Sequence, residues 1–381
     1  MEKVCGLDVH KDSVFACILD EQGKKILEKR YRTLTPDLTT LRETLIEQGC
    51  GSVAMESTSI YWIPVWHVLE SDFSLKLANP YFIKQLPGRK SDVKDAQWIA
   101  ECLQKDLIKG SFVPEGILQQ MRQVSRQLRR LSKSITRVKQ QIDNQLQRCN
   151  IRFSNYVSNQ GNNVSLRKIV DALIAGERDP SRLVRLVHGR TKNKHGHQVI
   201  AASMEGVINP TDIEMLKGCM EQINLFEKQQ AACLNHLEEL ADAYFAGEIS
   251  LLCTIPGIQK YSAMCILSEI GNDMSVFGKA SHLVGWAGLR PRNDESAGKI
   301  QSRKTMHGNK YLRQMLVEVS WSAARSKKTF LGKKYYLLSK RMKSQKALLS
   351  ITRKILVIIF NVLQTGQPFD ANRNLQAVMP D

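Results

Sequence analysis

The chain has 381 residues, of which 43% are hydrophobic and 24% charged, a composition ordinary for a globular protein of two or three domains. Its net charge of +18 favours a polyanion as partner, either nucleic acid or an anionic membrane surface. We expect no membrane partner, because no run of 18 apolar residues occurs and Asp8, His10, Lys11 and Asp12 interrupt any signal-peptide core.

The positive charge is concentrated in two blocks. Residues 116–148 hold eight Lys or Arg and one acid, and residues 297–354 hold 16 Lys or Arg and one acid. Such blocks are typical of proteins that bind nucleic acid. The nine cysteines include no CxxC pair, so we expect free thiols in a reducing cytoplasm.

The N-terminal part alternates between predicted strands and helices. Apolar runs predict strands at residues 3–9, 13–20, 24–31, 52–56 and 73–78. Thr35-Pro36 is a good helix start, and further helices are expected over 59–70, from 79–80 and over 92–103. Three strands followed by alternating helix and strand predict an α/β domain, in the order of a ribonuclease H-like fold.

Four acids stand at the ends of these elements. Asp8 follows the first apolar run, Glu56 follows the fourth, and Asp92 and Asp95 are three residues apart at the start of an expected helix. Each acid alone is better explained as a solvated surface charge or a helix cap. Together, in the order strand, strand, helix, they can converge at one sheet edge and hold Mg²⁺, which takes hard oxygen ligands. Two such ions would assist phosphoryl transfer, and Mn²⁺ could substitute.

Residues 116–148 predict a long coiled-coil helix. The apolar residues follow steps of four and three without a break: Ile117, Met121, Val124, Leu128, Leu131, Ile135, Val138 and Ile142. Basic residues are expected on the outer faces: Arg122, Arg126, Arg129, Arg130, Lys133, Arg137 and Lys139. These faces are either simply solvated or a nucleic-acid groove.

A second long helix is expected over residues 212–245. It would return antiparallel to the first, although either helix could instead pair with another protomer. Between them, residues 151–211 are polar and are expected to form loops with one short helix near 165–175. The role of this stretch stays open.

The C-terminal part predicts a mostly helical domain. Thr254-Ile255-Pro256-Gly257-Ile258 separates two apolar helical stretches, a turn that can aim backbone N–H groups at a phosphate. A strongly apolar helix is expected over residues 354–363.

Two sets of motifs resemble one family, the DEDD transposases of the one-ten insertion-sequence family, which are related to the Piv DNA invertase. The N-terminal set is Gly6-Leu7-Asp8-Val9-His10-Lys11, Met55-Glu56 and Ser91-Asp92-Val93-Lys94-Asp95-Ala96. The C-terminal set is Ile255-Pro256-Gly257, Gly288-Leu289-Arg290-Pro291, Glu295-Ser296-Ala297-Gly298-Lys299 and Gly308-Asn309-Lys310-Tyr311-Leu312-Arg313.

The resemblance implies a RuvC-like domain over residues 1–113, a coiled-coil region over 114–247 and a helical transposase domain over 248–372, before a tail at 373–381. It implies that Asp8, Glu56, Asp92 and Asp95 bind the metal and that Ser296 is a nucleophile. It also implies a bacterial, cytoplasmic enzyme acting on double-stranded DNA with a structured non-coding guide RNA.

The hypothesis is therefore a transposase that cuts and rejoins DNA through a metal-assisted phosphoserine intermediate. Because two duplexes must be cut, we expect a dimer or tetramer joined by the coiled coil. Nucleic-acid contacts are expected from Arg126, Arg129, Arg130, Lys133, Arg292, Lys299, Arg303, Lys304, Lys310 and Arg313.

Three alternatives remain. A Piv-like site-specific invertase would share every residue singled out above. A hydrolytic nuclease like a Holliday-junction resolvase would need the four acids and a water, but not Ser296. A non-enzymatic architectural protein would bind nucleic acid without metal.

Overall fold

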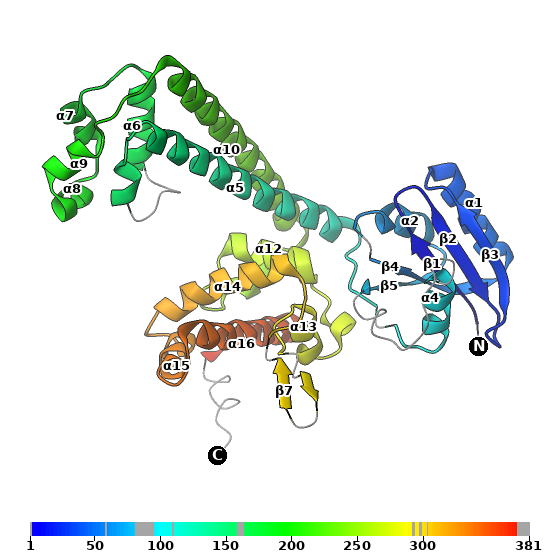
Figure 1. Ribbon diagram of the computed structural model, residues 1–381. Helices are drawn as coiled ribbons and strands as arrows, with labels where there is room; N and C mark the ends of the chain where they lie inside the picture. The colour runs from blue at the N-terminus through cyan, green and yellow to red at the C-terminus, as the bar shows by residue number, and fades with distance from the viewer. Residues whose placement is uncertain are drawn as a thin grey trace. The chain divides into compact units, whose positions relative to one another are not determined.

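The computed structural model describes residues 2–57, 59–80, 95–108, 110–157, 164–291, 294–296, 299–302 and 304–371. The chain divides into two compact units, Met1–Val113 and Pro114–Asp381. The first contains a mixed sheet with helices, and the second is mostly helical (Figure 1). The expectation of an α/β part followed by a helical part is thus confirmed.

The first unit is built on a five-stranded sheet in the order β3-β2-β1-β4-β5. Its strands are β1 (Lys3–Val9), β2 (Val14–Leu19), β3 (Lys25–Tyr31), β4 (Cys50–Glu56) and β5 (Ser74–Ala78). The first three strands pair antiparallel as a meander, whereas β4 pairs parallel to β1 and β5 parallel to β4. All five predicted strands are present, with ends within two residues of the expected ones.

Helices cover both faces of this sheet. The helices α1 (Thr35–Glu47) and α2 (Trp62–Leu69) contribute to an apolar cluster with Cys5, Leu7 and Val9 of β1. The opposite face is covered by α4 (Asp95–Gln104), which packs on Val4 and Ala54. The helix expected over residues 59–70 begins later than predicted, at Trp62. The helix expected from residues 79–80 lies mostly outside the described residues.

The second unit begins with two long helices that pair within the chain (Figure 1). These are α5 (Gly116–Arg148) and α10 (Pro210–Tyr244). They run antiparallel, because Gln145 near the end of α5 donates to Asp212 at the start of α10, whereas Ser132 accepts from Gln230 further along. The α5 seam is buried from Leu128 onward, so the predicted intramolecular coiled coil is confirmed.

Residues 149–157 and 164–209 form a small lobe at the far end of this coiled coil. It contains η2 (Phe153–Tyr156), α6 (Val164–Ile174), α7 (Pro180–Leu183), η4 (Val184–Leu186), α8 (Gly189–His195) and α9 (His197–Ala202). Phe153, Ile169 and Ile200 are fully buried in its core. The expected short helix is present, but the expectation of loops around it was wrong, because helices of four to seven residues are too short to show an apolar period.

Most of the remaining helices pack around α16 (Ser344–Thr365). They are α11 (Ala246–Cys253), η5 (Met274–Phe277), α13 (Ala280–Trp286), α14 (Lys310–Arg325) and α15 (Phe330–Ser339), whereas α12 (Lys260–Ile270) packs against α5, α11 and α14. By length and composition α16 could cross a membrane, but it is the core helix of this domain, with Ile351, Ile355 and Ile359 fully buried.

The turn between α11 and α12 is explained by packing. Gly257 has φ +95°, and a Cβ there would lie 2.7 Å from the carbonyl oxygen of Val319 in α14. Glycine at this position therefore allows the turn to approach the backbone of α14 closely.

Candidate functional site

The first candidate site is an acidic edge on the sheet of the first unit. Leu7 of β1 is the parallel partner of Met55 of β4, so the next residues, Asp8 and Glu56, are neighbours on adjacent strands about 4.8 Å apart. Side chains alternate between sheet faces. Leu7 and Met55 belong to the cluster with α1 and α2, so Asp8 and Glu56 stand on the opposite face, which α4 covers.

Gly6 brings the start of α4 to the same place. A Cβ at Gly6 would lie 2.1 Å from the carbonyl oxygen of Ala96 and 2.4 Å from the amide nitrogen of Ala100. The first turn of α4 therefore lies directly on β1, two residues from Asp8 and on its side of the sheet. Asp95 opens this helix, and so three of the four predicted acids gather at one edge; Asp92 lies outside the described residues.

The acidic edge has the oxygen donors that a hard divalent cation requires. The imidazole Nε2 of His10 lies 3.0 Å from a carboxylate oxygen of Asp8. Within the described ranges, no three His, Cys, Asp or Glu side chains are close enough to form a metal site by themselves. Mg²⁺ commonly takes waters and substrate phosphates as the rest of its ligand shell.

The second candidate site is the hairpin that carries Ser296, in the second unit. The strands β6 (Asp294–Ser296) and β7 (Lys299–Ser302) pair antiparallel, with Ser296 opposite Lys299. Ser296 is thus the last residue of β6, and Lys299 is the first of β7. Arg292 and Arg303, which flank this hairpin in the sequence, lie outside the described residues.

The base of this hairpin is fixed by two glycines. A Cβ at Gly308 would lie 2.2 Å from the amide nitrogen of Gly288, so the segments before and after the hairpin cross in direct backbone contact. The amide of Met306 donates to the carbonyl of Arg290 at 3.0 Å, and the guanidinium of Arg313 donates to the carbonyl of Gly288 at 3.3 Å. Two of the motifs noted in the sequence, residues 288–291 and 308–313, therefore pack against each other at the base of the hairpin; this pair of segments is called the clamp below.

A buried ion pair ties this clamp to the coiled coil. Arg126 of α5 donates two hydrogen bonds of 2.8 Å to the carboxylate of Glu269 in α12, which is 1% exposed. Asn309 donates to the same carboxylate at 2.6 Å and also caps α14 by accepting from the amides of Tyr311 and Leu312. The Arg126 guanidinium lies 4.4 Å from the ring centroid of Tyr311.

Arg122 joins the same contact. It donates to the carbonyl oxygens of Ser268 and Glu269, and burial lowers the pKa of its guanidinium to about 10 although Glu269 opposes that shift. The expectation that the basic residues of α5 line its outer faces was therefore wrong for Arg122 and Arg126, which face α12. Glu269 was missed, although a lone acid in an apolar helix was the available signal.

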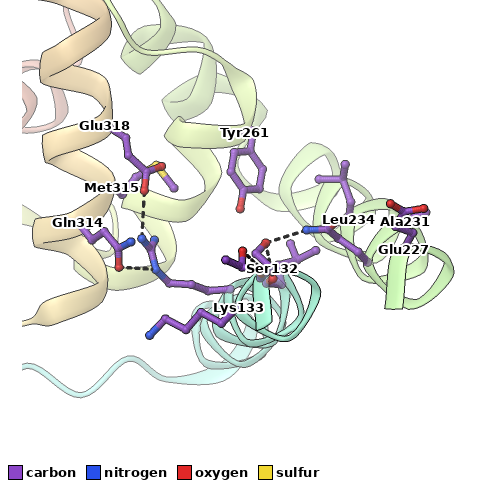
Figure 2. Close-up of a pocket in the computed structure, with 13 residues that line it drawn as sticks. Ser132, Lys133, Glu227, Ala231, Leu234, Tyr261, Gln314, Met315 and Glu318 are labelled. Carbon is purple, nitrogen blue, oxygen red and sulfur yellow. Dashed lines mark hydrogen bonds and ion pairs between the residues drawn. The ribbon is translucent and has the colours of Figure 1, made fainter. Parts of the chain in front are cut away.

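Further along α5, Arg129 and Lys133 line an open cavity of about 800 Å³ between α5, α10, α12 and α14 (Figure 2). Arg129 donates to Gln314 at 2.8 Å and to Glu318 at 3.1 Å. Glu227 also lines the cavity, so its two basic residues are balanced by two acids. The cavity is therefore not a strongly positive channel, and Arg130, bonded to Gln127, and Lys133 are the more accessible cations.

Two family models match the chain. Residues 5–151 match a model described as a transposase, of the DEDD and IS110 type, and residues 249–337 match a model described as the transposase IS116/IS110/IS902 family. Together they cover both candidate sites and more than half of the chain.

The pilin gene-inverting proteins of Moraxella bovis and Moraxella lacunata are similar over a shorter stretch. Each is 35% identical to this chain over 127 residues, which is 32% of this chain and 38% of the relative. The alignment thus spans well under half the length of either relative.

Both models describe transposases, the class of enzymes that recombine DNA. The chain is therefore similar to transposases of the IS110 type over residues 5–151 and of the IS116/IS110/IS902 family over residues 249–337. The resemblance drawn from the sequence motifs, including the relation to a DNA invertase, is thereby confirmed.

Proposed function

We propose that the protein is an insertion-sequence transposase that cuts and rejoins DNA through a covalent phosphoserine intermediate. The first unit would be a RuvC-like, ribonuclease H-fold domain that carries the metal-binding acids. The observation that carries this proposal is the placement of Asp8 and Glu56 on adjacent parallel strands, on the face where α4 begins with Asp95.

The acids Asp8, Glu56, Asp92 and Asp95 would hold Mg²⁺, for which their carboxylates are the right chemistry. When bound, the metal would supply Lewis-acid polarisation of a phosphodiester. Gly6 would have a positioning role, because any side chain at this position would overlap the backbone of α4 where it lies beside Asp8.

Ser296 would be the nucleophile. Its hydroxyl oxygen forms a bond to phosphorus, the bond from phosphorus to a sugar oxygen breaks, and the hydroxyl proton passes to that leaving oxygen. The phosphoserine link conserves the bond energy, so the reverse reaction on another strand rejoins DNA without ATP. Lys299 and Arg292, close to Ser296 in sequence, would offset charge on the phosphate, with Arg303, Lys304, Lys310 and Arg313 contacting the backbone.

A guide RNA and a homo-oligomer complete the proposal. The basic block of residues 297–354 is compatible with holding both DNA and RNA. Because α5 and α10 bury their seams against each other, oligomer contacts would have to use other surfaces than those seams.

A covalent-adduct assay tests this function. Purified protein, Mg²⁺, element-derived RNA and labelled end-junction DNA are mixed, denatured and resolved on a gel. We expect a protein-linked DNA band that disappears in Ser296→Ala, in Asp8→Asn and without RNA. Ser302→Ala in the same hairpin and Asp12→Asn near the same strand are matched controls that should keep the band.

Free nicked DNA that persists in Ser296→Ala but disappears in Asp8→Asn would refute the phosphoserine step. It would mean that water is the nucleophile, as in a resolvase-like nuclease. DNA binding without any metal-dependent cleavage would overturn the enzymatic proposal altogether.

A second candidate function, site-specific DNA inversion, is favoured by the 35% identity to the pilin gene-inverting proteins. It would use the same residues, so the products must distinguish the two. The protein is expressed with the DNA that flanks its gene, and new junctions are sequenced. Insertion at a separate target supports transposition, whereas reversal of one adjacent segment supports inversion.

A further inference from the structure

The lobe at the end of the coiled coil carries basic surface that neither candidate site uses. Residues 180–204 contain five Lys or Arg and three His but not a single acid. They form α7, η4, α8 and α9, which lie together at the outer end of the lobe (Figure 1). Neither family model covers this stretch.

The helix α8 contributes most to this surface. Its sequence is Gly-Arg-Thr-Lys-Asn-Lys-His, and it buries no residue, so its composition is not explained by packing. Arg190 and Lys194 are exposed and one turn apart on one face, where like charges destabilise a helix slightly. Within the described part of the chain, Arg190, Lys192 and Lys194 form no ion pair that would offset this repulsion.

The two ends of α8 are nevertheless held in place. The amide of His188 donates to the hydroxyl oxygen of Ser165 at 3.0 Å, and the His188 ring accepts from the amide of Arg190. At the other end, the ring of His195 meets Tyr156 edge-on, with centroids 5.4 Å apart. The cations are therefore presented on a supported helix rather than on a free loop.

We propose that the outer end of this lobe binds the sugar-phosphate backbone of a nucleic-acid duplex, through Arg190, Lys192 and Lys194. Supported cations without acidic partners suit phosphates, which provide position and affinity without reading sequence. A single strand fits less well, because single-strand binders stack bases on aromatic side chains and residues 180–204 contain no Phe, Tyr or Trp. The inference rests on the proposed function, which places the protein on nucleic acid.

The test measures the salt dependence of binding by the full-length protein. Fluorescence anisotropy is recorded with labelled random-sequence DNA and RNA duplexes over a range of salt, for the parent and for Arg190→Gln/Lys194→Gln. We expect weaker binding and a slope of log K against log salt that is shallower by about two units, one for each lost phosphate contact. A larger loss on RNA than on DNA assigns the surface to the guide, and the reverse assigns it to DNA.

The matched control is Lys217→Gln/Lys228→Gln, which removes the same charge from exposed positions on α10. It should keep the parental slope. Equal salt slopes for all three proteins would overturn the proposal. So would an equal loss of affinity and slope in both variants, because only the net charge would then matter. A changed oligomeric state of the α8 variant in light scattering, with an unchanged slope, would also overturn it, in favour of a protein partner.

The adduct assay separates this inference from the proposed function. At saturating protein the α8 variant should still form the Ser296 adduct, because its chemistry is untouched. If the parent forms the adduct but the variant binds duplexes with the parental slope, only the inference about the lobe fails. If the parent forms no adduct, the proposed function fails first.

Discussion

The ion pair between Arg126 and Glu269 should be one of the strongest single contributions to the stability of the second unit. Glu269→Gln keeps the side-chain volume but leaves the guanidinium groups of Arg122 and Arg126 against a neutral group, and the Arg122 side chain is only 13% exposed. Glu269 accepts two hydrogen bonds from Arg126 and one from Asn309, and it is 1% exposed. Removing one partner of such a buried pair costs about 3–5 kcal/mol.

For a unit of this size, each kcal/mol corresponds to roughly 2–3 °C, so the melting temperature should fall by ~6–15 °C. Hydrogen exchange of peptides from α12, followed along a thermal ramp, reports on the second unit separately from the first. This separation is needed because a chain of two units need not melt in one transition.

Glu318→Gln is the matched control. Glu318 also joins an α5 arginine, Arg129, to the helical domain, but its side chain is 56% exposed. An exposed pair is worth only about 0–1 kcal/mol, so the melting temperature should move by less than roughly 3 °C. Equal shifts in the two variants, or a shift below 3 °C for Glu269→Gln, would refute the assignment of burial as the cause.

Three further predictions follow from the contacts of single residues. Gly6→Ala should abolish the covalent adduct while leaving duplex binding intact, because its Cβ would lie 2.1 Å from a carbonyl oxygen of α4; a normal adduct yield contradicts this. Lys133→Gln should make the salt slope of binding shallower by about one unit without changing the melting temperature. Arg126→Gln should instead lower the melting temperature without changing the salt slope. Burial raises the pKa of the Cys50 thiol to about 11, so this thiol ionises first in the unfolded chain and the first unit should lose stability as pH rises from 9 towards 11. At pH 8 the exposed Cys253 should be alkylated well before the buried Cys50. Mass spectrometry that found Cys50 alkylated first would contradict this.

The elements of the first unit could be predicted from the sequence because each signal is local. The strands are apolar runs, and the start of α1 is marked by Thr35-Pro36. The unbroken heptad seam of α5 is equally local, and it predicted a long helix whose partner turned out to be α10. Asp8 and Glu56 could be paired in advance because successive parallel strands end at the same edge of a sheet.

Contacts between distant parts of the chain could not be read in this way. Arg126 is separated from Glu269 by 143 residues, and nothing in a heptad pattern distinguishes an arginine that faces another helix from one that faces solvent. Most of the lobe was missed for a different reason, because its helices other than α6 are too short to carry a period. The motif glycines Gly288 and Gly308 were noticed, but their mutual contact appears only in three dimensions.

These contacts change how the positive charge of the chain should be interpreted. The basic block of residues 116–148 looks uniform in the sequence, yet Arg122 and Arg126 are used for a buried contact and Arg129 is paired across a charge-balanced cavity. A guanidinium already bonded to a carboxylate gains little from a phosphate, because it must first give up that partner. Affinity for nucleic acid should therefore come from cations without acidic partners, which in the described part of this unit include Lys133 and the surface of α8. Net charge predicted the kind of partner, but the pairing of individual side chains decides where on the molecule that partner binds.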